Sequence, residues 1–312
     1  MEGKEPMRYG VILPNLGALA HPHILTSLAH RAEELGFDGV FVSDHVILPT
    51  TPGSRYPYRS DGTFPLRPDQ NILEPITTLS YLAAVTTRVH LGFSVLVLPY
   101  RHPVLNAKML GNLDVFSGGR LIVGVGVGWM EEEFVALGAD YAHRGQVTDE
   151  HIMLMHNLWS RDEPEFAGEH YQLSGMTMYP KTHQRPHPPI WTGGISPSAL
   201  RRAARLGDGW HGVRMGPEDI AGVRTQIQNL RGESDEAFQR FDISLRVGLD
   251  IVHSDLPRSR LPMRGSPDQV TNDIQAYRQA GLTYLVLEPR ARDAAEFVGQ
   301  MERLTREILP QV

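Results

Sequence analysis

The residues best suited to proton transfer are the adjacent pair Asp44-His45. A histidine titrates near neutrality, so it can give or accept a proton, and the neighbouring aspartate can accept a hydrogen bond from a ring amide. The pair directly follows Gly39 to Ser43, an apolar run that is typical of a buried strand. A helix-like cap or a loop hydrogen bond would explain the same dipeptide, but a position at the end of a strand favours catalysis.

A run of alternating glycine and valine, Gly124 to Gly128, places its glycines on one face of a strand and its valines on the other. If the valines contact outer helices, the glycines face an open end of the fold and leave room for a flat ligand against the backbone. The alternative is a narrowing of the fold that only glycine accommodates. The run is not a dinucleotide-binding fingerprint, because Trp129 stands where that motif requires glycine.

A second glycine-rich segment, with the sequence PIWTGG, ends in Gly193-Gly194 and leads through Ser196 into a predicted helix. Free backbone N–H groups at such a turn could hold a phosphate. A plain tight turn explains the same residues equally well.

The chain alternates short β-rich runs with amphipathic segments, and this rhythm predicts repeated βα units. The predicted strands are 8–14, 39–43, 89–98, 120–127, 189–193, 209–213, 243–252 and 283–287. The predicted helices are 23–35, 74–85, 103–116, 147–159, 198–206, 217–231, 267–280 and 294–309. Eight units in this length favour an α/β protein of the (β/α)₈ TIM-barrel type over a doubly wound sheet.

Long connections interrupt the predicted barrel after strands 2, 4 and 7, and residues 160–188 carry runs short enough for a small hairpin outside the main sheet. We see no internal boundary, so we expect a single domain over residues 1–312. Active sites of such barrels lie at the carboxyl ends of the strands. The residues expected there are Asn15, Asp44, His45, Ser94, Val95, Gly128 and Trp129.

Composition excludes several classes of function. The 30 basic and 36 acidic residues give a formal net charge of −6, without the basic run that nucleic acid or an anionic bilayer requires. The chain has no cysteine, which excludes disulfides and thiolate chemistry and fits a reducing compartment. No signal peptide or membrane-spanning run is evident, so we expect a cytoplasmic protein.

The 14 histidines invite a metal hypothesis, but their spacing does not support one. No H-E-x-x-H motif occurs, and Pro186 lies between His183 and His187, which spoils a shared helical face. We therefore expect no catalytic metal. A nucleophile elbow and a Walker A loop are also missing from the sequence, so hydrolase and nucleoside triphosphatase functions lose their best evidence.

Four stretches resemble a known family across nearly the whole chain, and together they are more specific than any single motif. The sequence resembles the bacterial luciferase-like oxidoreductases and, within them, the branch that uses the deazaflavin coenzyme F-420. The stretches are YGVILPN at 9–15, AEELGFDGVFVSDHVILP at 32–49, the segment from LGFSVLVLPYRHP to GVGVGWMEEEF at 91–134, and PPIWTGGISPSALRRAARLGDGWHG at 188–212.

The resemblance implies a barrel with insertions, usually dimeric, in which the deazaflavin ring lies in the mouth and exchanges a hydride at its C5 atom. By position, Asp44 matches an aspartate that contacts the cofactor. His45 matches a histidine that works beside the ring as proton donor or acceptor.

Other matches concern the rest of the cofactor site. Ser94-Val95 matches the family's bulge at the end of strand three, often joined by a non-prolyl cis peptide that supports the ring from behind, so we expect this bond to be cis. Gly193-Gly194 matches the loop near the phosphate, and Gly128 completes the expected cofactor-binding set.

Two positions depart from the sugar-phosphate dehydrogenases of the family. Trp129 stands where those enzymes and the secondary-alcohol dehydrogenases place a glutamate, and Val97 replaces a polar residue of the sugar-phosphate enzyme. Their substrate chemistry therefore does not transfer to this chain. We expect a less polar substrate pocket, lined by Trp129 and Asn15.

Three functional hypotheses follow. The leading one is an oxidoreductase that transfers a hydride between coenzyme F-420 and a C=C, C=N or C=O bond of a small organic substrate, with His45 moving the proton. The second is an FMN-dependent monooxygenase served by a separate reductase, because the two cofactors share a ribityl phosphate and a tricyclic ring. The third is a non-catalytic cofactor-binding barrel, against which the intact Asp44-His45 pair argues.

Overall fold

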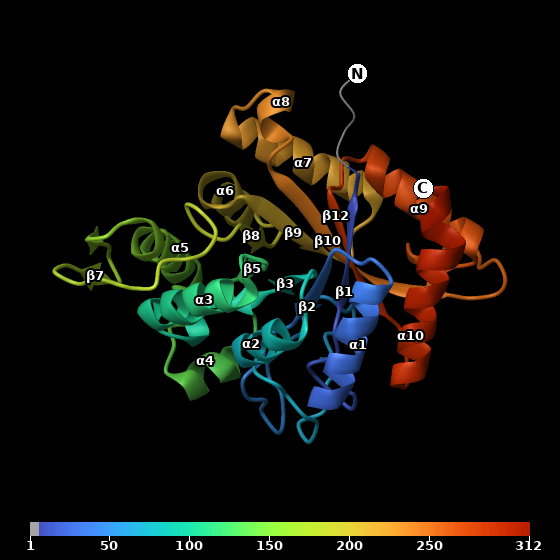
Figure 1. The fold of residues 1–312 in the computed structure, drawn as a ribbon, viewed down its shortest axis with the longest axis horizontal. Coiled ribbons are helices and arrows are strands. Elements are labelled where there is room, and N and C mark those ends of the chain that lie inside the picture. The colour runs from blue at the N-terminus through green and yellow to red at the C-terminus, as the bar shows by residue number, and fades with distance from the viewer. Residues whose placement is uncertain (1–5) are drawn as a thin grey trace.

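A closed barrel of parallel strands forms the centre of the protein, in a computed structural model that describes residues 6–312 (Figure 1). The strand order around the barrel is β10-β12-β1-β2-β3-β5-β8-β9, and pairing of β9 with β10 closes the ring. The barrel strands are β1 (Arg8–Ile12), β2 (Gly39–Val42), β3 (His90–Phe93), β5 (Leu121–Gly126), β8 (Ile190–Gly193), β9 (Gly209–Val213), β10 (Asp242–Ile251) and β12 (Tyr284–Pro289). The predicted (β/α)₈ fold is confirmed.

A helix follows each barrel strand and covers its outer face. These helices are α1 (Pro22–Glu34), α2 (Pro75–Val85), α3 (Pro103–Ser117), α5 (Arg144–Ser160), α6 (Pro197–Leu206), α7 (Pro217–Arg231), α9 (Pro267–Gln279) and α10 (Ala294–Arg303). Most begin with proline, whose fixed φ and missing N–H suit the first helical turn. None of the helices within residues 6–312 is long and apolar enough to cross a bilayer.

Large rings fill part of the barrel interior. Phe41 makes an edge contact with Tyr284 at 5.5 Å and stacks near Trp191 at 5.9 Å, so the rings of three strands meet. Glycine makes this possible, because a Cβ atom at Gly92 would lie 2.2 Å from the Phe41 ring. The filled interior leaves the mouth at the carboxyl ends of the strands as the place for a ligand.

The predicted strand 89–98 is two elements. β3 ends at Phe93, a cis peptide joins Ser94 to Val95, and a short strand β4 (Leu96–Val97) then pairs with β5. The expected cis bond at this position is confirmed. A 3₁₀ turn (Leu98–Tyr100) follows directly and leads toward α3.

The glycine face of β5 has a different neighbour from the one expected. A Cβ atom at Gly124 would lie 1.9 Å from the Phe93 carbonyl oxygen, and one at Gly126 would lie 2.5 Å from the Val95 side chain. At Gly124 the open face therefore accommodates the bulge of the adjacent strand, whereas Gly126 lies against the bulge and also lines the cavity at the strand ends. Val125, from the valine face, is buried in the main hydrophobic core.

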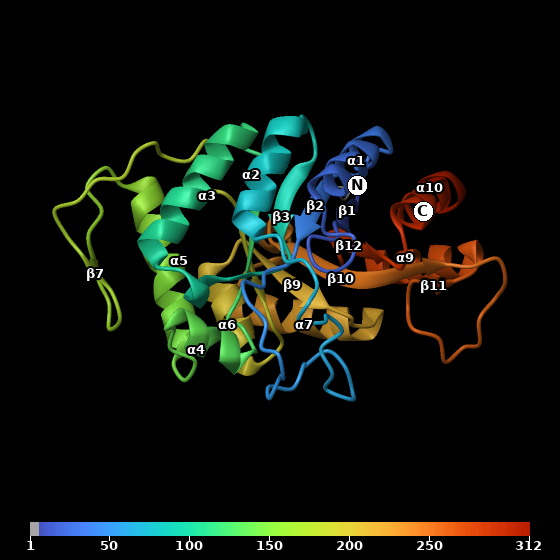
Figure 2. The same cartoon turned by 90° about the horizontal axis from the view of Figure 1, so that it is seen from below.

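The long connections carry short elements of their own. The predicted hairpin is present as β6 (Phe166–Ala167) and β7 (Gln172–Leu173), which project away from the barrel. The connection after β5 contains a helix that was not predicted, α4 (Glu131–Leu137). α8 (Asp235–Phe238) and β11 (Arg264–Gly265) were not predicted either. Figure 2 shows α4 and the loop between β2 and α2 on the same side of the molecule.

The two histidines of α5, His151 and His156, are buried or partly buried, and burial favours their neutral form. Burial lowers the pKa of His151 to about 3, and its Nε2 contacts the Tyr171 hydroxyl at 3.0 Å. Burial and the nearby His187, whose ring stacks at 4.0 Å, lower the pKa of His156 to about 4. Within residues 6–312, no group of three or more His, Asp or Glu side chains is arranged to hold a metal ion.

These histidines predict a loss of stability in mild acid. The unfolded chain binds protons at both side chains near pH 6.5, whereas the folded protein resists protonation down to about pH 3 to 4. Their contribution to the free energy of unfolding should therefore be constant above pH 7 and fall below pH 6.5, approaching about 1.4 kcal/mol per pH unit for each histidine. Urea titrations from pH 8 to pH 4.5 measure this slope.

The matched test replaces single histidines. His156→Gln should make the acid slope shallower, and the same change at the exposed His253 should leave it as it is. An equal slope in the unmutated protein and in His156→Gln would contradict the explanation.

Candidate active site

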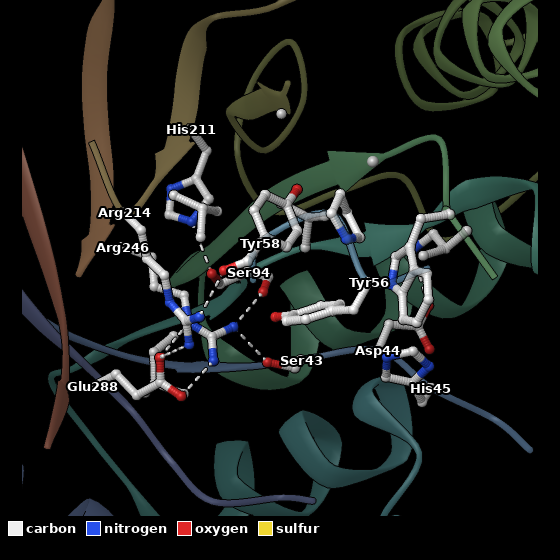
Figure 3. Close-up of a pocket in the computed structure, with 18 of the residues that line it drawn as sticks. Ser43, Asp44, His45, Tyr56, Tyr58, Ser94, His211, Arg214, Arg246 and Glu288 are labelled. Carbon is white, nitrogen blue, oxygen red and sulfur yellow. Dashed lines mark hydrogen bonds and ion pairs between the residues drawn. The ribbon is translucent and has the colours of Figure 1, made fainter. Parts of the chain in front are cut away.

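A cavity of about 1250 Å³ opens at the carboxyl ends of the barrel strands. Every site residue predicted from the sequence lines it: Asn15, Asp44, His45, Ser94, Val95, Gly128, Trp129, Gly193 and Gly194. Figure 3 shows Asp44 and His45 on one side of the cavity, and His211, Arg214, Arg246 and Glu288 on the other. The structure therefore brings together predicted residues as far apart in the sequence as Asn15 and Gly194, more than half of the chain.

The partner of His45 is Glu133 of α4, not Asp44. His45 Nδ1 lies 2.6 Å from Glu133 Oε2, and the glutamate side chain is fully buried. The same carboxylate accepts hydrogen bonds from the backbone N–H groups of Val46 and Ile47, at 2.8 and 3.3 Å, and from the Tyr100 hydroxyl at 3.0 Å. Glu133 thus fixes both the His45 ring and the loop that follows it.

This arrangement determines which edge of His45 faces the cavity. Burial raises the pKa of Glu133, but the hydrogen bonds from His45, Val46 and Ile47 outweigh that effect, so the pKa is lowered overall. An ionised carboxylate can only accept hydrogen bonds, so His45 Nδ1 carries a proton. The Nε2 edge is the one left to a ligand in the cavity.

Asp44 is held in an ion pair. Its two oxygens accept two hydrogen bonds from Arg101, at 2.8 and 2.9 Å, and one from the Val97 N–H at 2.9 Å. Arg101 also donates to Glu74 at 2.8 Å. Burial lowers the pKa of Arg101, but the bonds to Asp44 outweigh it and the pKa is raised. Asp44 therefore ties the end of β2 to the segment after the bulge.

Asn15 joins the loops at the base of the cavity. Its amide donates to the Ser43 and Leu73 carbonyls, at 2.8 and 2.9 Å, and its oxygen accepts from the Ser43 N–H at 2.9 Å. The side chain is buried and all of its bonds are to backbone. Its place in the lining was predicted, while its structural bonds were not.

The opposite wall carries positive charge. Arg246 pairs with Glu288 at 2.9 Å and donates to Ser43 Oγ at 2.8 Å and to the Ser94 carbonyl at 3.2 Å. Arg214, a residue with φ of +55°, lies 3.8 Å from Glu288. The charge of Arg246 lowers the pKa of Glu288, so two guanidinium groups share one carboxylate at this wall.

An aromatic cluster, Tyr56, Phe64 and Trp129, covers His45. The three rings contact one another at 5.2 to 5.3 Å, and His45 lies 4.7 Å from Phe64 and 6.0 Å from Trp129. Tyr56 and Phe64 come from the loop after β2, which α4 holds through hydrogen bonds between Glu132 and Ser54 at 2.6 and 2.9 Å. The cluster gives this side of the cavity an apolar surface.

The loop after β8 presents bare backbone to the cavity. Gly194 has φ of +102°, and a Cβ atom there would lie 2.9 Å from Ala199. Ser196 caps α6 by accepting a hydrogen bond from the Ala199 N–H. Arg144 lines the same cavity and its Nε atom is buried without a hydrogen-bond partner. Open backbone, a helix start and a guanidinium are together suited to a phosphate group.

Comparison with known proteins identifies the family. The sequence model of the luciferase-like monooxygenases matches residues 7–255. The chain belongs to this family. A family relative, an uncharacterized protein of Mycobacterium tuberculosis, is 36% identical over 211 residues, covering 66% of this chain and 71% of that protein.

Relatives with named activities use two cofactors. The FMNH2-dependent dimethylsulfone monooxygenase of Pseudomonas putida is 32% identical over 52% of this chain and 44% of its own length. The F-420-dependent glucose-6-phosphate dehydrogenase of Amycolatopsis mediterranei is 25% identical over 93% and 95%.

Solved structures share the fold. A monooxygenase from Streptomyces bottropensis has a TM-score of 0.76 at 22% identity, covering 97% of this chain and 99% of its own. An F-420-dependent secondary alcohol dehydrogenase has a TM-score of 0.76 at 16% identity, covering 98% and 99%. A monooxygenase and an F-420-dependent dehydrogenase therefore have the same fold as this chain.

Sequence reasoning missed the groups that hold the predicted residues. Glu133 belongs to the acidic run EEE just after a strand end, and that position was the available signal. His211, Arg246 and Glu288 are polar residues inside otherwise apolar strands, which is a second signal. Arg101 lies shortly after the third predicted strand, which was its signal, but its two carboxylate partners lie 57 and 27 residues away and could not be foreseen.

Loss of the Glu133 charge should destabilise the protein. Glu133→Gln keeps the shape of the side chain but replaces one of its two acceptor oxygens with an NH2 donor, which would face the N–H and O–H donors of its partners. We therefore expect the free energy of unfolding to fall by about 2–4 kcal/mol. Urea unfolding followed by tryptophan fluorescence measures it. The exposed neighbour supplies the control, because Glu131→Gln should change stability little. Equal effects of the two changes would show that the buried carboxylate is not an anchor.

Proposed function

We propose that this protein is an oxidoreductase that transfers a hydride between coenzyme F-420 and a C=C, C=N or C=O bond of a small organic substrate, with His45 as the proton donor or acceptor. The observation that carries the proposal is the cavity in which His45, fixed by Glu133, faces the same space as the bare loop at Gly193-Gly194. When bound, a deazaflavin supplies the hydride chemistry.

Residues of this chain would hold both the phosphate and the ring of such a cofactor. The Gly193-Gly194 loop and Arg144 suit its phosphate. Ser94, Val95 and Gly128 line the same cavity, and the ring would lie against them. The substrate would then meet Trp129 and the rest of the aromatic cluster, which excludes water from His45. The apolar surface favours a substrate with a flat or apolar body.

His45 would move the proton through Nε2. A proton accepted there makes the ring positive, and the ionised Glu133 at 2.6 Å stabilises that charge. Asp44, held by Arg101, keeps the strand end that carries His45 in place. His45 thus differs from Asp44, because its Nδ1 edge is held by Glu133 while its Nε2 edge is left to the cavity.

The alternative is an FMN-dependent monooxygenase that receives reduced FMN from a separate reductase. The Pseudomonas relative favours it, because that enzyme is FMNH2-dependent. The phosphate-suited loop serves either cofactor. A cofactor-binding barrel without catalysis is the third possibility, and the buried His45–Glu133 pair argues against it, since a binding protein has no need of an oriented proton carrier.

Side-by-side titrations decide between the cofactors. We expect F-420 to bind with a lower Kd than FMN when quenching of intrinsic or cofactor fluorescence is measured. Arg144→Ala should weaken both by about tenfold, since both carry a phosphate, and Arg205→Ala on the exposed side of α6 should not. Micromolar FMN binding without detectable F-420 binding would favour the monooxygenase.

Replacement of His45 separates binding from chemistry. His45→Ala should leave the Kd of the cofactor nearly unchanged and lower turnover by about 10² to 10⁴, the usual contribution of a general acid or base. His23→Ala, in an exposed part of α1, is the control. Weaker binding with intact turnover of the bound enzyme would show that His45 only packs against the ring.

We also propose a homodimer, with the outer face of α3 as its contact surface. Leu105 and Phe116 of this helix are 51% and 67% exposed, and Tyr81 of the neighbouring α2 is 44% exposed. Spacing along the helix places Leu105, Met109 and Phe116 on one side, so they form an apolar stripe.

Sedimentation velocity tests this stripe. Phe116→Glu should dissociate the dimer at micromolar concentration, because it would bury a charge in the contact, whereas Leu230→Glu on the exposed side of α7 should not. A monomeric unmutated protein would contradict the dimer itself, and a dimer that persists in Phe116→Glu would contradict this surface.

A further inference from the structure

The side chains of Ser94, His211 and Ser244 form a buried hydrogen-bond chain beside the cavity. Ser244 Oγ lies 2.9 Å from the Trp210 carbonyl and 2.8 Å from His211 Nδ1. His211 Nε2 in turn lies 2.8 Å from Ser94 Oγ. All three side chains are buried, and Ser94 and His211 line the cavity (Figure 3).

Counting the available protons shows which group donates in each of these hydrogen bonds. A carbonyl oxygen can only accept, so Ser244 donates its single hydroxyl proton to Trp210. Ser244 Oγ must then accept at its other contact, which places a proton on His211 Nδ1. The tautomer of His211 is therefore set from outside the cavity.

His211 stays neutral in this position. Burial, with a further contribution from the charge of Arg246, lowers the pKa of His211 to about 3. A neutral ring with its proton on Nδ1 has a lone pair on Nε2. Ser94 is consequently the donor in the last hydrogen bond, and its only hydroxyl proton points at His211 rather than into the cavity.

We propose that His211 and Ser244 are positioning residues that make the Ser94 hydroxyl an acceptor toward the cavity, where it accepts a hydrogen bond from an N–H group of the bound cofactor ring. The nature of the ligand rests on the proposed function; the orientation of Ser94 does not. Both the deazaflavin and the flavin carry an N–H group in the pyrimidine part of the ring, so either cofactor can supply the donor.

This arrangement favours ligands that present a hydrogen-bond donor, rather than an acceptor, to Ser94. An atom with only a lone pair would meet the lone pairs of Ser94 and would lose its hydrogen bond to water without replacement. A cavity side chain free to rotate would accept both kinds of atom. A serine hydroxyl can normally either donate or accept a hydrogen bond. The buried His211 therefore restricts Ser94 to the role of acceptor toward the cavity.

The first test reads the tautomer directly, in the protein without cofactor. We expect ¹⁵N NMR of histidine-labelled protein, with His211 assigned by its loss in His211→Phe, to show a protonated Nδ1 and an unprotonated Nε2 from pH 8 down to pH 5. A proton on Nε2, or a positively charged ring within this range, would overturn the inference. If His211→Phe does not fold, Ser244→Ala, which removes the acceptor of the Nδ1 proton, supplies the assignment.

The second test is a double-mutant cycle on cofactor affinity. Ser94→Ala should raise the Kd of whichever of F-420 or FMN binds the unmutated protein by about three- to tenfold. His211→Phe should raise it by no more than Ser94→Ala does, because the freed hydroxyl can still accept a hydrogen bond. The double variant should bind no more weakly than Ser94→Ala alone, because His211 acts only through Ser94. Additive effects would show that His211 only fills space and would overturn its role.

The two tests fail differently. If neither cofactor binds while the NMR tautomer is as expected, the proposed function and the cofactor part of the inference are wrong, and the orientation of Ser94 stands. If the cofactor binds but the tautomer differs, the proposed function survives and this inference does not.

Discussion

The arrangement of the site depends on one buried carboxylate. Glu133 has no exposed surface and accepts hydrogen bonds from His45, Tyr100 and two backbone N–H groups of the loop after β2. A charge in such a place is tolerated only when its acceptor positions are filled, so the carboxylate requires these partners as much as they require it. One interaction therefore orients the His45 ring, fixes the loop and joins α4 to the barrel.

The barrel supplies the complementary constraint. Phe41, Tyr284 and Trp191 fill the interior at one level, and glycines such as Gly92 leave the space that these rings need. The cavity at the mouth is lined in part by polar groups, among them Ser94, whose hydroxyl bonds to His211. This division explains why the cavity opens at the carboxyl ends of the strands and why its walls are polar on one side and aromatic on the other.

The fold and the lining of the cavity were predictable, because both depend on local sequence. Period and turn residues locate the strands and helices, and the residue after each strand must lie at the mouth. The partners of those residues were not predictable in the same way. Asp44-His45 is a pair in the sequence, yet Asp44 bonds to Arg101 and His45 to Glu133, 57 and 88 residues away. The side chains of these two adjacent residues point in different directions. Only the three-dimensional structure shows which distant groups they contact.

The bulge at Ser94 also shows that the sequence predicts local features better than contacts between distant residues. The resemblance predicted a cis peptide there, and the structure has it. The glycines of β5 were expected to open a surface for a ligand. Gly124 instead makes room for the bulge itself, while Gly126 makes room for the bulge and also lines the cavity. A face that lacks side chains indicates that something approaches closely, and its neighbours in space determine whether that is a ligand or another strand.

The most direct measurement is a crystal structure of the protein soaked with reduced F-420 and, separately, with reduced FMN. The account predicts a ring in the cavity beside Ser94 and Val95, within reach of His45 Nε2, with the phosphate at the Gly193-Gly194 loop. His45 should still contact Glu133 through Nδ1. A ring bound outside this cavity, or a His45 that turns away from both Glu133 and the ring, would contradict the account.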